Sequence, residues 1–197
     1  VINNIVFGSP DRKKITFLEG WNMNQVAMHL SKELNFNHSE VLKLLSDEEL
    51  IQELAVSSNT LEGYLFPETY YFFEGVDKTS VIKRLVKEHK KFWNDVNLSK
   101  ADSLGFTPYE ITTLASIIEG EAIYDSERPI ISAVYHNRLK IGMKLQADPT
   151  VQYIIDDGPR RLLNKDLRIK SPYNTYMYQG LPPGPINSPG EQSLIAA

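Results

Sequence analysis

The sequence predicts an α+β fold, in which a helix-rich domain with short strands forms a cleft around one central helix. Two observations support this class. Apolar residues recur at helical spacing through most of the chain, whereas strand-like runs are few and short. Alternating helical patterns with so few long strands argue against a doubly wound sheet.

Composition limits the kinds of protein that the chain can be. Its 197 residues suffice for one large domain or two small ones, and 42% hydrophobic and 23% charged residues are ordinary for a globular protein. A net charge of −4 without a basic run gives no indication of nucleic-acid binding. The absence of cysteine excludes disulfides, thiolate metal sites and cysteine nucleophiles. No apolar run approaches the roughly 20 residues that span a bilayer. Because the chain begins at Val1, we expect a fragment of a longer protein.

The first half of the chain contains ordinary packing elements. Residues 1–12 resemble a strand and turn at the end of an upstream element, and residues 14–18 predict a short strand. Asn22 is suited to cap a helix with one apolar face. Residues 39–55 predict two further short helices, and residues 81–93 predict an amphipathic helix with a solvated, lysine-rich face.

The segment 61–73 is unusually rich in aromatic residues. Gly63 and Pro67 interrupt it, so it does not fit a plain helix. One interpretation is a strand and loop that line the core. The other is a cleft wall, because tyrosine rings stack on sugars while nearby polar groups orient them.

The central helix is predicted over Thr107–Ala122. Thr107 is suited to cap its first turn, Pro108 occupies a position where a missing N–H costs nothing, and Glu110 completes a capping box. Apolar residues then recur at helical spacing, so one stripe of the helix is expected to face the interior.

Two glutamates end this helix, and the spacing predicts different surroundings for them. Glu121 falls on the apolar stripe, whereas Glu119 falls nearer the polar edge. Apolar neighbours and the negative end of the helix dipole both raise a carboxyl pKa, as a general acid requires. The alternative is that Glu121 extends into solvent or pairs with Arg128 or Arg138. We therefore expect the substitution Glu119→Gln to have only a mild effect on activity.

Further elements follow the central helix. Residues 125–139 predict a helix, and Asp148 is suited to cap another with Pro149 at its first position. A contact with substrate is the alternative role for Asp148. The loop 171–190 combines proline, glycine and tyrosine, as is typical of rigid binding loops. Its end, Ser188–Glu191, predicts a capping box for a last helix.

Several long motifs in fixed order resemble the YceG-like family of endolytic murein transglycosylases, from about residue 14 onward. The motifs are Leu18–Gly20, Glu62–Tyr70, Ala115–Ala122, Asn137–Val151, Tyr173–Tyr176 and Gly180–Ile186. The resemblance implies that Glu121, the second glutamate of Glu-x-Glu, is the catalytic residue. It also implies a lyase-type cleavage of the β-1,4 bond between N-acetylmuramic acid and N-acetylglucosamine within peptidoglycan strands, which leaves 1,6-anhydro-muramic acid ends.

One carboxyl group suffices for such a reaction, since it acts as acid and then as base, and neither a metal nor a cofactor is expected. The residues expected to bind the glycan are Tyr173, Asn174 and Tyr176, with Gln146, Glu68, Tyr64 and Asp148 as further candidates.

The resemblance also suggests how the chain is organised and where it works. Residues 1–13 would end an upstream LysM-like module, 14–100 would form a smaller α+β subdomain that includes one cleft wall, and 101–197 would form a C-terminally truncated catalytic subdomain. We expect a location on the outer face of the bacterial cytoplasmic membrane, anchored by an N-terminal helix absent from this chain. The expected partners are peptidoglycan glycan strands and cell-wall synthesis proteins, and not nucleic acid.

Two other functions stay open at this stage. A hydrolase of the same polymer would need a second carboxylate, for which Glu68 and Asp148 are the candidates. A non-catalytic peptidoglycan-binding module is the other alternative.

Overall fold

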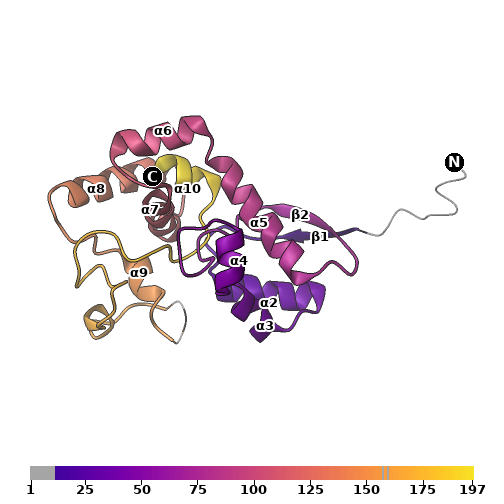
Figure 1. Cartoon of the computed structure of the whole chain (residues 1–197). Helices are drawn as coiled ribbons and strands as arrows, with labels where there is room; N and C mark the ends of the chain where they lie inside the picture. The colour runs from indigo at the N-terminus through magenta and orange to yellow at the C-terminus, as the bar shows by residue number, and fades with distance from the viewer. Residues whose placement is uncertain (1–11, 157, 159) are drawn as a thin grey trace, which may run out of the picture.

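The computed structural model describes residues 12–156, 158 and 160–197, and it confirms the α+β class. The expected strand at residues 1–12 lies almost entirely outside the described residues. Helices dominate, together with one two-stranded antiparallel sheet (Figure 1). The described elements are β1 (Arg12–Thr16), α2 (Met23–Leu34), α3 (His38–Leu44), α4 (Glu48–Glu53), β2 (Thr69–Phe73), α5 (Lys78–Phe92), α6 (Asp95–Leu104), α7 (Pro108–Glu121), η1 (Asp125–Glu127), α8 (Arg128–Lys140), α9 (Asp148–Gln152), η2 (Asp166–Arg168) and α10 (Glu191–Ala196).

The sheet joins the start of the described chain to the aromatic segment. Strand β1 pairs with β2 in a register that places Ile15 opposite Tyr70. Along β2, Tyr70 and Phe72 are buried while Tyr71 and Phe73 are exposed, as the period of two in a strand requires. The buried face packs in a hydrophobic cluster with residues of α2 to α5. Most of segment 61–73 therefore serves the core, as the first of its two interpretations proposed.

Helix α7 begins as the sequence predicts, with Thr107 as its cap and a complete capping box with Glu110. The prediction of a single apolar stripe is too narrow, because every residue from 111 to 118 is buried. Such a helix is covered on all sides. Helices α6, α8, α9 and α10 contact it, and Figure 1 shows it in the middle of the C-terminal half.

A second hydrophobic cluster surrounds α7 and is formed by residues 101–197. The two clusters meet along α7, where Tyr109 packs against the first one. The expected subdomain boundary at residue 100 stays a prediction.

Two backbone hydrogen bonds also connect segments near the two ends of the described chain. The Gly20 N–H donates to Ser188 O, and the Ser188 N–H donates to Trp21 O.

The sequence predictions fail at two helix starts. Helix α10 begins after Gly190 rather than after Ser188, and no side chain caps it. Helix α6 was not anticipated, although Asn94 caps it with two hydrogen bonds and Gly105 ends it in a left-handed conformation. Both signals are present in the sequence, but α6 has only one buried residue and hence little helical periodicity to reveal it.

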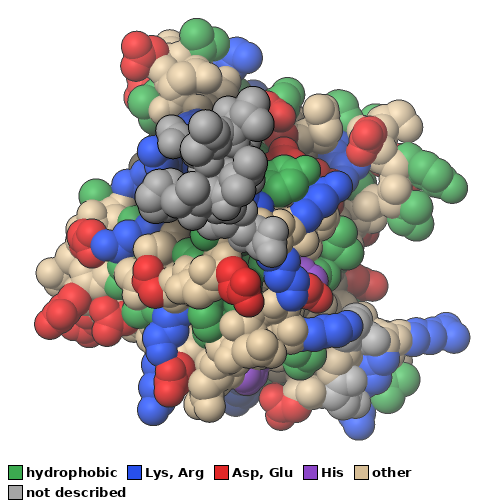
Figure 2. Space-filling view, turned by 90° about the vertical axis from the view of Figure 1, so that its right-hand side faces the viewer, with side chains coloured by type: hydrophobic (Ala, Val, Ile, Leu, Met, Phe, Trp, Pro, Cys, Tyr) green, Lys and Arg blue, Asp and Glu red, His purple; other side chains and the backbone are tan. Residues whose placement is uncertain are grey.

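The surface carries charged side chains of both signs. Figure 2 shows positive and negative side chains of the described residues interspersed over one face, without a large region of a single sign. Among the described residues, no helix combines the length and the apolar character needed to cross a membrane.

Candidate active site

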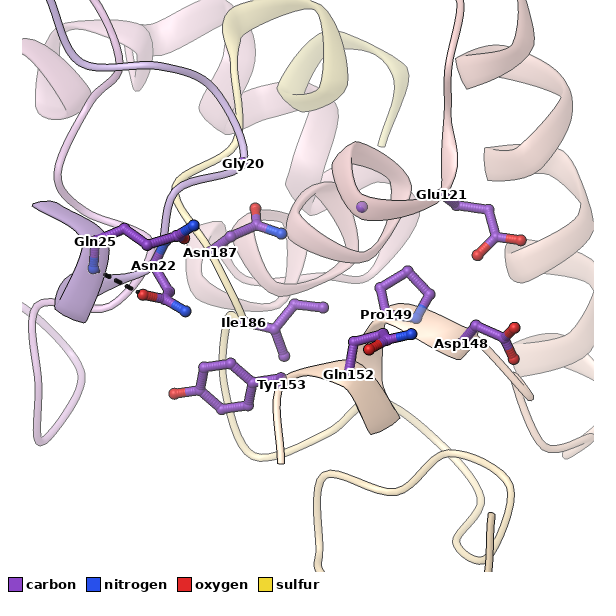
Figure 3. Close-up of a pocket in the computed structure, with 11 residues that line it drawn as sticks. Gly20, Asn22, Gln25, Glu121, Asp148, Pro149, Gln152, Tyr153, Ile186 and Asn187 are labelled. Atoms are coloured by element: carbon purple, nitrogen blue, oxygen red, sulfur yellow. Dashed lines mark hydrogen bonds between the residues drawn. The ribbon is translucent and has the colours of Figure 1, made fainter. Parts of the chain in front are cut away.

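The C-terminal end of α7 opens into a pocket of about 460 Å³ that contains Glu121 (Figure 3). Its size is typical of a ligand site. Segments from both halves of the chain contribute to its walls. The lining residues are Gly20, Asn22, Gln25, Gly120, Glu121, Asp148, Pro149, Gln152, Tyr153, Ile186 and Asn187.

The loop 171–190 forms one wall because α7 anchors it. The backbone N–H of Ile186 donates to Ser116 Oγ, at 3.0 Å, and the Asn187 side-chain amide donates to Ser116 O, at 2.8 Å. Both hydrogen bonds are buried. Because buried hydrogen bonds are strong and the helix is fixed, they hold the loop in a defined position. Ile186 and Asn187 thereby reach the pocket, as the binding-loop prediction required.

The opposite wall comes from the start of α2, and not from the aromatic segment 61–73 as expected. Asn22 and Gln25 form the capping box of α2, and the Gln25 N–H donates to Asn22 Oδ1 (Figure 3). No residue of 61–73 lines the pocket. The segment approaches it only through Glu62, whose carboxyl group accepts from Met23 N–H and lies 3.4 Å from the Tyr153 hydroxyl.

Glu62 is therefore a support behind the pocket wall. It is almost completely buried, and burial raises its pKa to about 8, although the Met23 N–H opposes the shift. A neutral carboxylic acid at this position links the first turn of α2 to Tyr153, which lines the pocket.

Glu121 projects into the pocket. Within the described part of the chain it makes no hydrogen bond or ion pair. Its side chain is exposed to the pocket, but the protein surrounds the carboxyl group closely enough that burial is the largest cause raising its pKa. The negative charge of Asp148 raises the pKa further, and Arg138 lowers it. The group thus has the property of a general acid, together with free access to a ligand.

Glu119 is the more buried of the two glutamates, which reverses the expectation from helical spacing. Its side chain is only 8% exposed and forms an ion pair with Arg128 at 3.1 Å. It also accepts hydrogen bonds from Gly190 N–H, at 3.0 Å, and from Ser193 Oγ, at 2.7 Å. Arg128 in turn donates to Ser193 and pairs with Asp125. Glu119 therefore ties α7 to α8 and α10, so the substitution Glu119→Gln is expected to lower stability, while its mild effect on activity stays a prediction.

Asp148 also differs from its expected role as a cap. The cap of α9 is Ala147, and no side chain caps the helix. The Asp148 carboxylate instead accepts a hydrogen bond from the Tyr176 hydroxyl and faces the pocket (Figure 3). Of the candidate glycan contacts, the structure thus brings Asp148 next to Glu121, with Tyr176 behind it.

The other two candidates in the tyrosine loop lie away from the pocket lining. Asn174 is completely buried, donates to Leu167 O and Ile169 O, and accepts from the Tyr176 N–H. It shapes the loop and has no exposed surface in this structure, and its direct contact with a ligand stays a prediction. Tyr173 packs on Tyr153 with a ring-centroid separation of 5.1 Å and supports the pocket wall from behind.

The remaining candidates are farther removed. Tyr64 is buried and packs on His89 and Tyr109 in the core. Glu68 is exposed at the start of β2, where it accepts from the Thr69 N–H, and it does not line the pocket. Gln146 is exposed with a positive φ of 51°, and its backbone N–H joins it to Thr175 O. Glu68 therefore does not line the pocket, and its role as a second carboxylate stays a prediction.

Sequence reasoning missed several lining residues. Asn22 was identified only as a cap, and Gln25, Gln152 and Tyr153 carry no local signal. Their amide and hydroxyl groups are the chemistry that binds sugar hydroxyls. Within the described residues, no cluster of three or more His, Cys, Asp or Glu side chains is arranged to hold a metal ion.

Comparisons with known proteins identify what the chain resembles. The model of the YceG-like family matches residues 1–197. A protein of Bacillus subtilis (strain 168) named endolytic murein transglycosylase is 36% identical over 93% of this chain, and one of Streptococcus pneumoniae (strain ATCC BAA-255 / R6) with the same name is 30% identical over 91%. A crystal structure of a yceG-like protein from Listeria monocytogenes is similar with a TM-score of 0.84 and 33% identity, over 96% of this chain and 67% of that one. The chain spans 55% and 37% of the lengths of the two curated relatives.

Proposed function

The chain belongs to the YceG-like family, and from this premise we propose that it cleaves peptidoglycan glycan strands internally as a lytic transglycosylase. One observation carries the proposal. Glu121 has a raised pKa and no ion pair or hydrogen bond with any described residue, and it lies at the end of a rigidly held helix, inside a pocket lined by amides. Relatives that carry the name endolytic murein transglycosylase support the choice of substrate.

The reaction requires only one carboxyl group. As the bond between C1 of N-acetylmuramic acid and O4 of the next sugar breaks, Glu121 donates its proton to O4. Its carboxylate then accepts the proton of the C6 hydroxyl while O6 bonds to C1 and closes the 1,6-anhydro ring. The proton is thus returned to Glu121, and no water is consumed. The nucleophile belongs to the substrate itself, which gives it a high effective concentration.

The pocket walls would position the glycan. Asn22 and Gln25 from one half and Gln152 and Asn187 from the other face a common space. Amides donate and accept hydrogen bonds at once, as sugar hydroxyls and acetamido groups do. We propose these four residues as glycan contacts, in place of Asn174, Tyr64 and Glu68.

The test is mass spectrometry of the products from purified murein. Lytic cleavage gives 1,6-anhydro-muramic acid ends, and internal cleavage shortens the strands without releasing single disaccharides first. Products with reducing ends would contradict the lytic reaction, and binding without any product would contradict catalysis by this chain.

A hydrolase is the second candidate, because the structure places a second carboxylate, Asp148, in the same pocket as Glu121. In a hydrolase, Asp148 would act as base or nucleophile and the products would carry reducing ends. The same mass spectra therefore separate the two functions.

The cellular setting is proposed on the family alone. Glycan strands of the bacterial cell wall are the proposed partner, which places the protein outside the cytoplasmic membrane. A membrane anchor, a LysM-like module and contacts with cell-wall synthesis proteins stay predictions about a longer protein.

A further inference from the structure

Two carboxyl groups share one end of the pocket, and the packing of two helices brings them together. Gly120 lies directly under Pro149, so closely that an added Cβ would lie 2.7 Å from Pro149 Cβ. Through this contact, the start of α9 packs against the C-terminal end of α7. As a result, the residues that flank the contact, Glu121 and Asp148, point into the same space with their carboxyl groups turned toward each other (Figure 3).

The position of Asp148 is fixed from a second direction. The Tyr176 hydroxyl donates to its carboxylate. The loop that carries Tyr176 is bound to the segment before α9, because the Ala147 N–H donates to Thr175 Oγ1 at 3.0 Å and Thr175 and Thr150 share a buried hydrogen bond of 2.8 Å. Asp148 is thus a placed charge and not a mobile surface group.

The titratable groups around Glu121 come from every element packed against it. Asp148 belongs to α9, Arg138 and Tyr135 to α8, and Tyr176 to the loop. Tyr135 and Tyr176 have pKa values raised above the ordinary range, chiefly by burial, so they are neutral near pH 7. Two charges of opposite sign therefore act on Glu121, namely Asp148 and Arg138.

We propose that Asp148 is a positioning residue for the lytic reaction, whose fixed negative charge keeps the proton on Glu121 until the leaving oxygen takes it. The positive charge of Arg138 opposes this effect, because it lowers the pKa of Glu121. The inference rests on the proposed function, in which Glu121 must begin each turnover protonated. Asp148 acts through Glu121 and forms no bond to the sugar, in contrast to the second carboxylate of a hydrolase.

The experiment uses two substitutions with opposite effects on the charge near Glu121. Asp148→Asn removes the negative charge and keeps the shape, whereas Arg138→Gln removes the positive one. The readout is kcat/KM against pH for the release of anhydro ends from murein, whose high-pH limb reports the ionisation of the acid in the free enzyme. We expect Asp148→Asn to move this limb to lower pH by about one unit and Arg138→Gln to move it to higher pH. At pH values above the pKa of the acid, a shift of this pKa by one unit changes kcat/KM about tenfold.

Arg138→Lys is the matched control, because it retains the charge that Arg138→Gln removes. Its limb should stay at the wild-type pH. Arg138 also donates to Leu145 O, so a loss of folding common to both Arg138 variants would appear in thermal unfolding and not as a displaced limb. Asp148→Asn gives an independent measurement that does not depend on this contact.

Three outcomes would overturn the inference. The first is an Asp148→Asn limb that stays in place while the rate falls at every pH, which would assign Asp148 a direct role on the sugar. The second is a limb that moves in the same direction for both charge substitutions. The third is an Arg138→Lys limb that moves as far as that of Arg138→Gln. Wild-type products with reducing ends would instead contradict the proposed function, whatever the position of the limbs.

Discussion

Two glutamates lie two residues apart at the end of α7, and their surroundings differ in almost every respect. Glu119 is buried and holds Arg128, Gly190 and Ser193. Glu121 faces a pocket and has no such partner among the described residues. Burial alone therefore does not identify a reactive acid. A buried carboxylate with all its acceptor sites used is structural, whereas a partly surrounded one without a partner can exchange its proton.

The largest effect expected from this comparison is on activity. Glu121→Gln should lower glycan cleavage by at least about 10²–10⁴-fold, because the amide keeps the shape of the side chain but has no proton to donate. Thermal unfolding should be almost unchanged, since no described residue depends on Glu121 for a hydrogen bond. The measurement is the release of anhydro-muropeptides from murein. Normal turnover by this variant would place the acid elsewhere.

Glu119→Gln should reverse that pattern and affect stability first. Removing the charge of Glu119 leaves the buried Arg128 guanidinium paired only with the exposed carboxylates of Asp125 and Glu19 among the described residues. The NH2 group of the new amide also faces the Gly190 or Ser193 donor, and the expected cost is about 3 kcal/mol. Urea unfolding measures the loss. The control is Glu53→Gln, which breaks the exposed pair with Lys83 and should cost less than about 1 kcal/mol. Equal losses in the two variants would show that Glu119 is not held as described.

Glu62 is a third carboxyl group, which is buried and forms no ion pair with any cation of the described residues. Its folded-state pKa is raised to about 8 from an ordinary 4.5. Between these values the folded protein keeps a proton that the unfolded chain releases, so stability falls as pH rises, by at most about 1.4 kcal/mol per pH unit, and levels off above pH 8. The difference in unfolding free energy between wild type and Glu62→Gln, measured from pH 5 to pH 9, isolates this slope. A difference that is constant with pH would refute it.

Gly120, between the two glutamates, should give the smallest effect. An Ala Cβ there would collide with Pro149, at a cost of about 2 kcal/mol, while helix propensity returns about 1 kcal/mol. We expect a net loss of about 1 kcal/mol in urea unfolding, together with slower cleavage, because α9 and Asp148 are displaced from Glu121. A variant that is more stable than wild type would show that the contact with Pro149 is looser than described.

The start of α7 could be predicted from sequence because its signals are local. Thr107, Pro108 and Glu110 act within one turn, and the structure reproduces their capping box. The environments of the two glutamates could not be predicted in this way. They depend on Arg128, Gly190 and Pro149, which reach the helix from other elements and bury it on all sides. Helical spacing predicts a direction for each side chain but not what packs against it.

The pocket shows the same limit. The loop at 171–190 could be predicted as a wall from its prolines and tyrosines, and it does supply Ile186 and Asn187. The other wall was predicted to be the aromatic segment 61–73, because an aromatic composition fits a sugar-binding wall and a hydrophobic core equally well. Asn22 and Gln25 were recognisable as a helix start, but only the tertiary fold turns that start toward Glu121.

The hydrogen bonds between Gly20, Trp21 and Ser188 also bear on when the pocket forms during synthesis. Contacts between such distant parts of a chain require the closure of a very long loop and form late in folding. At about 5–20 residues per second, a ribosome completes Ser188 on the order of ten seconds after Gly20. A nascent chain that already carries Glu121 thus lacks the bridge that joins the two walls. The complete pocket is therefore expected to assemble only after Ser188 has been synthesised.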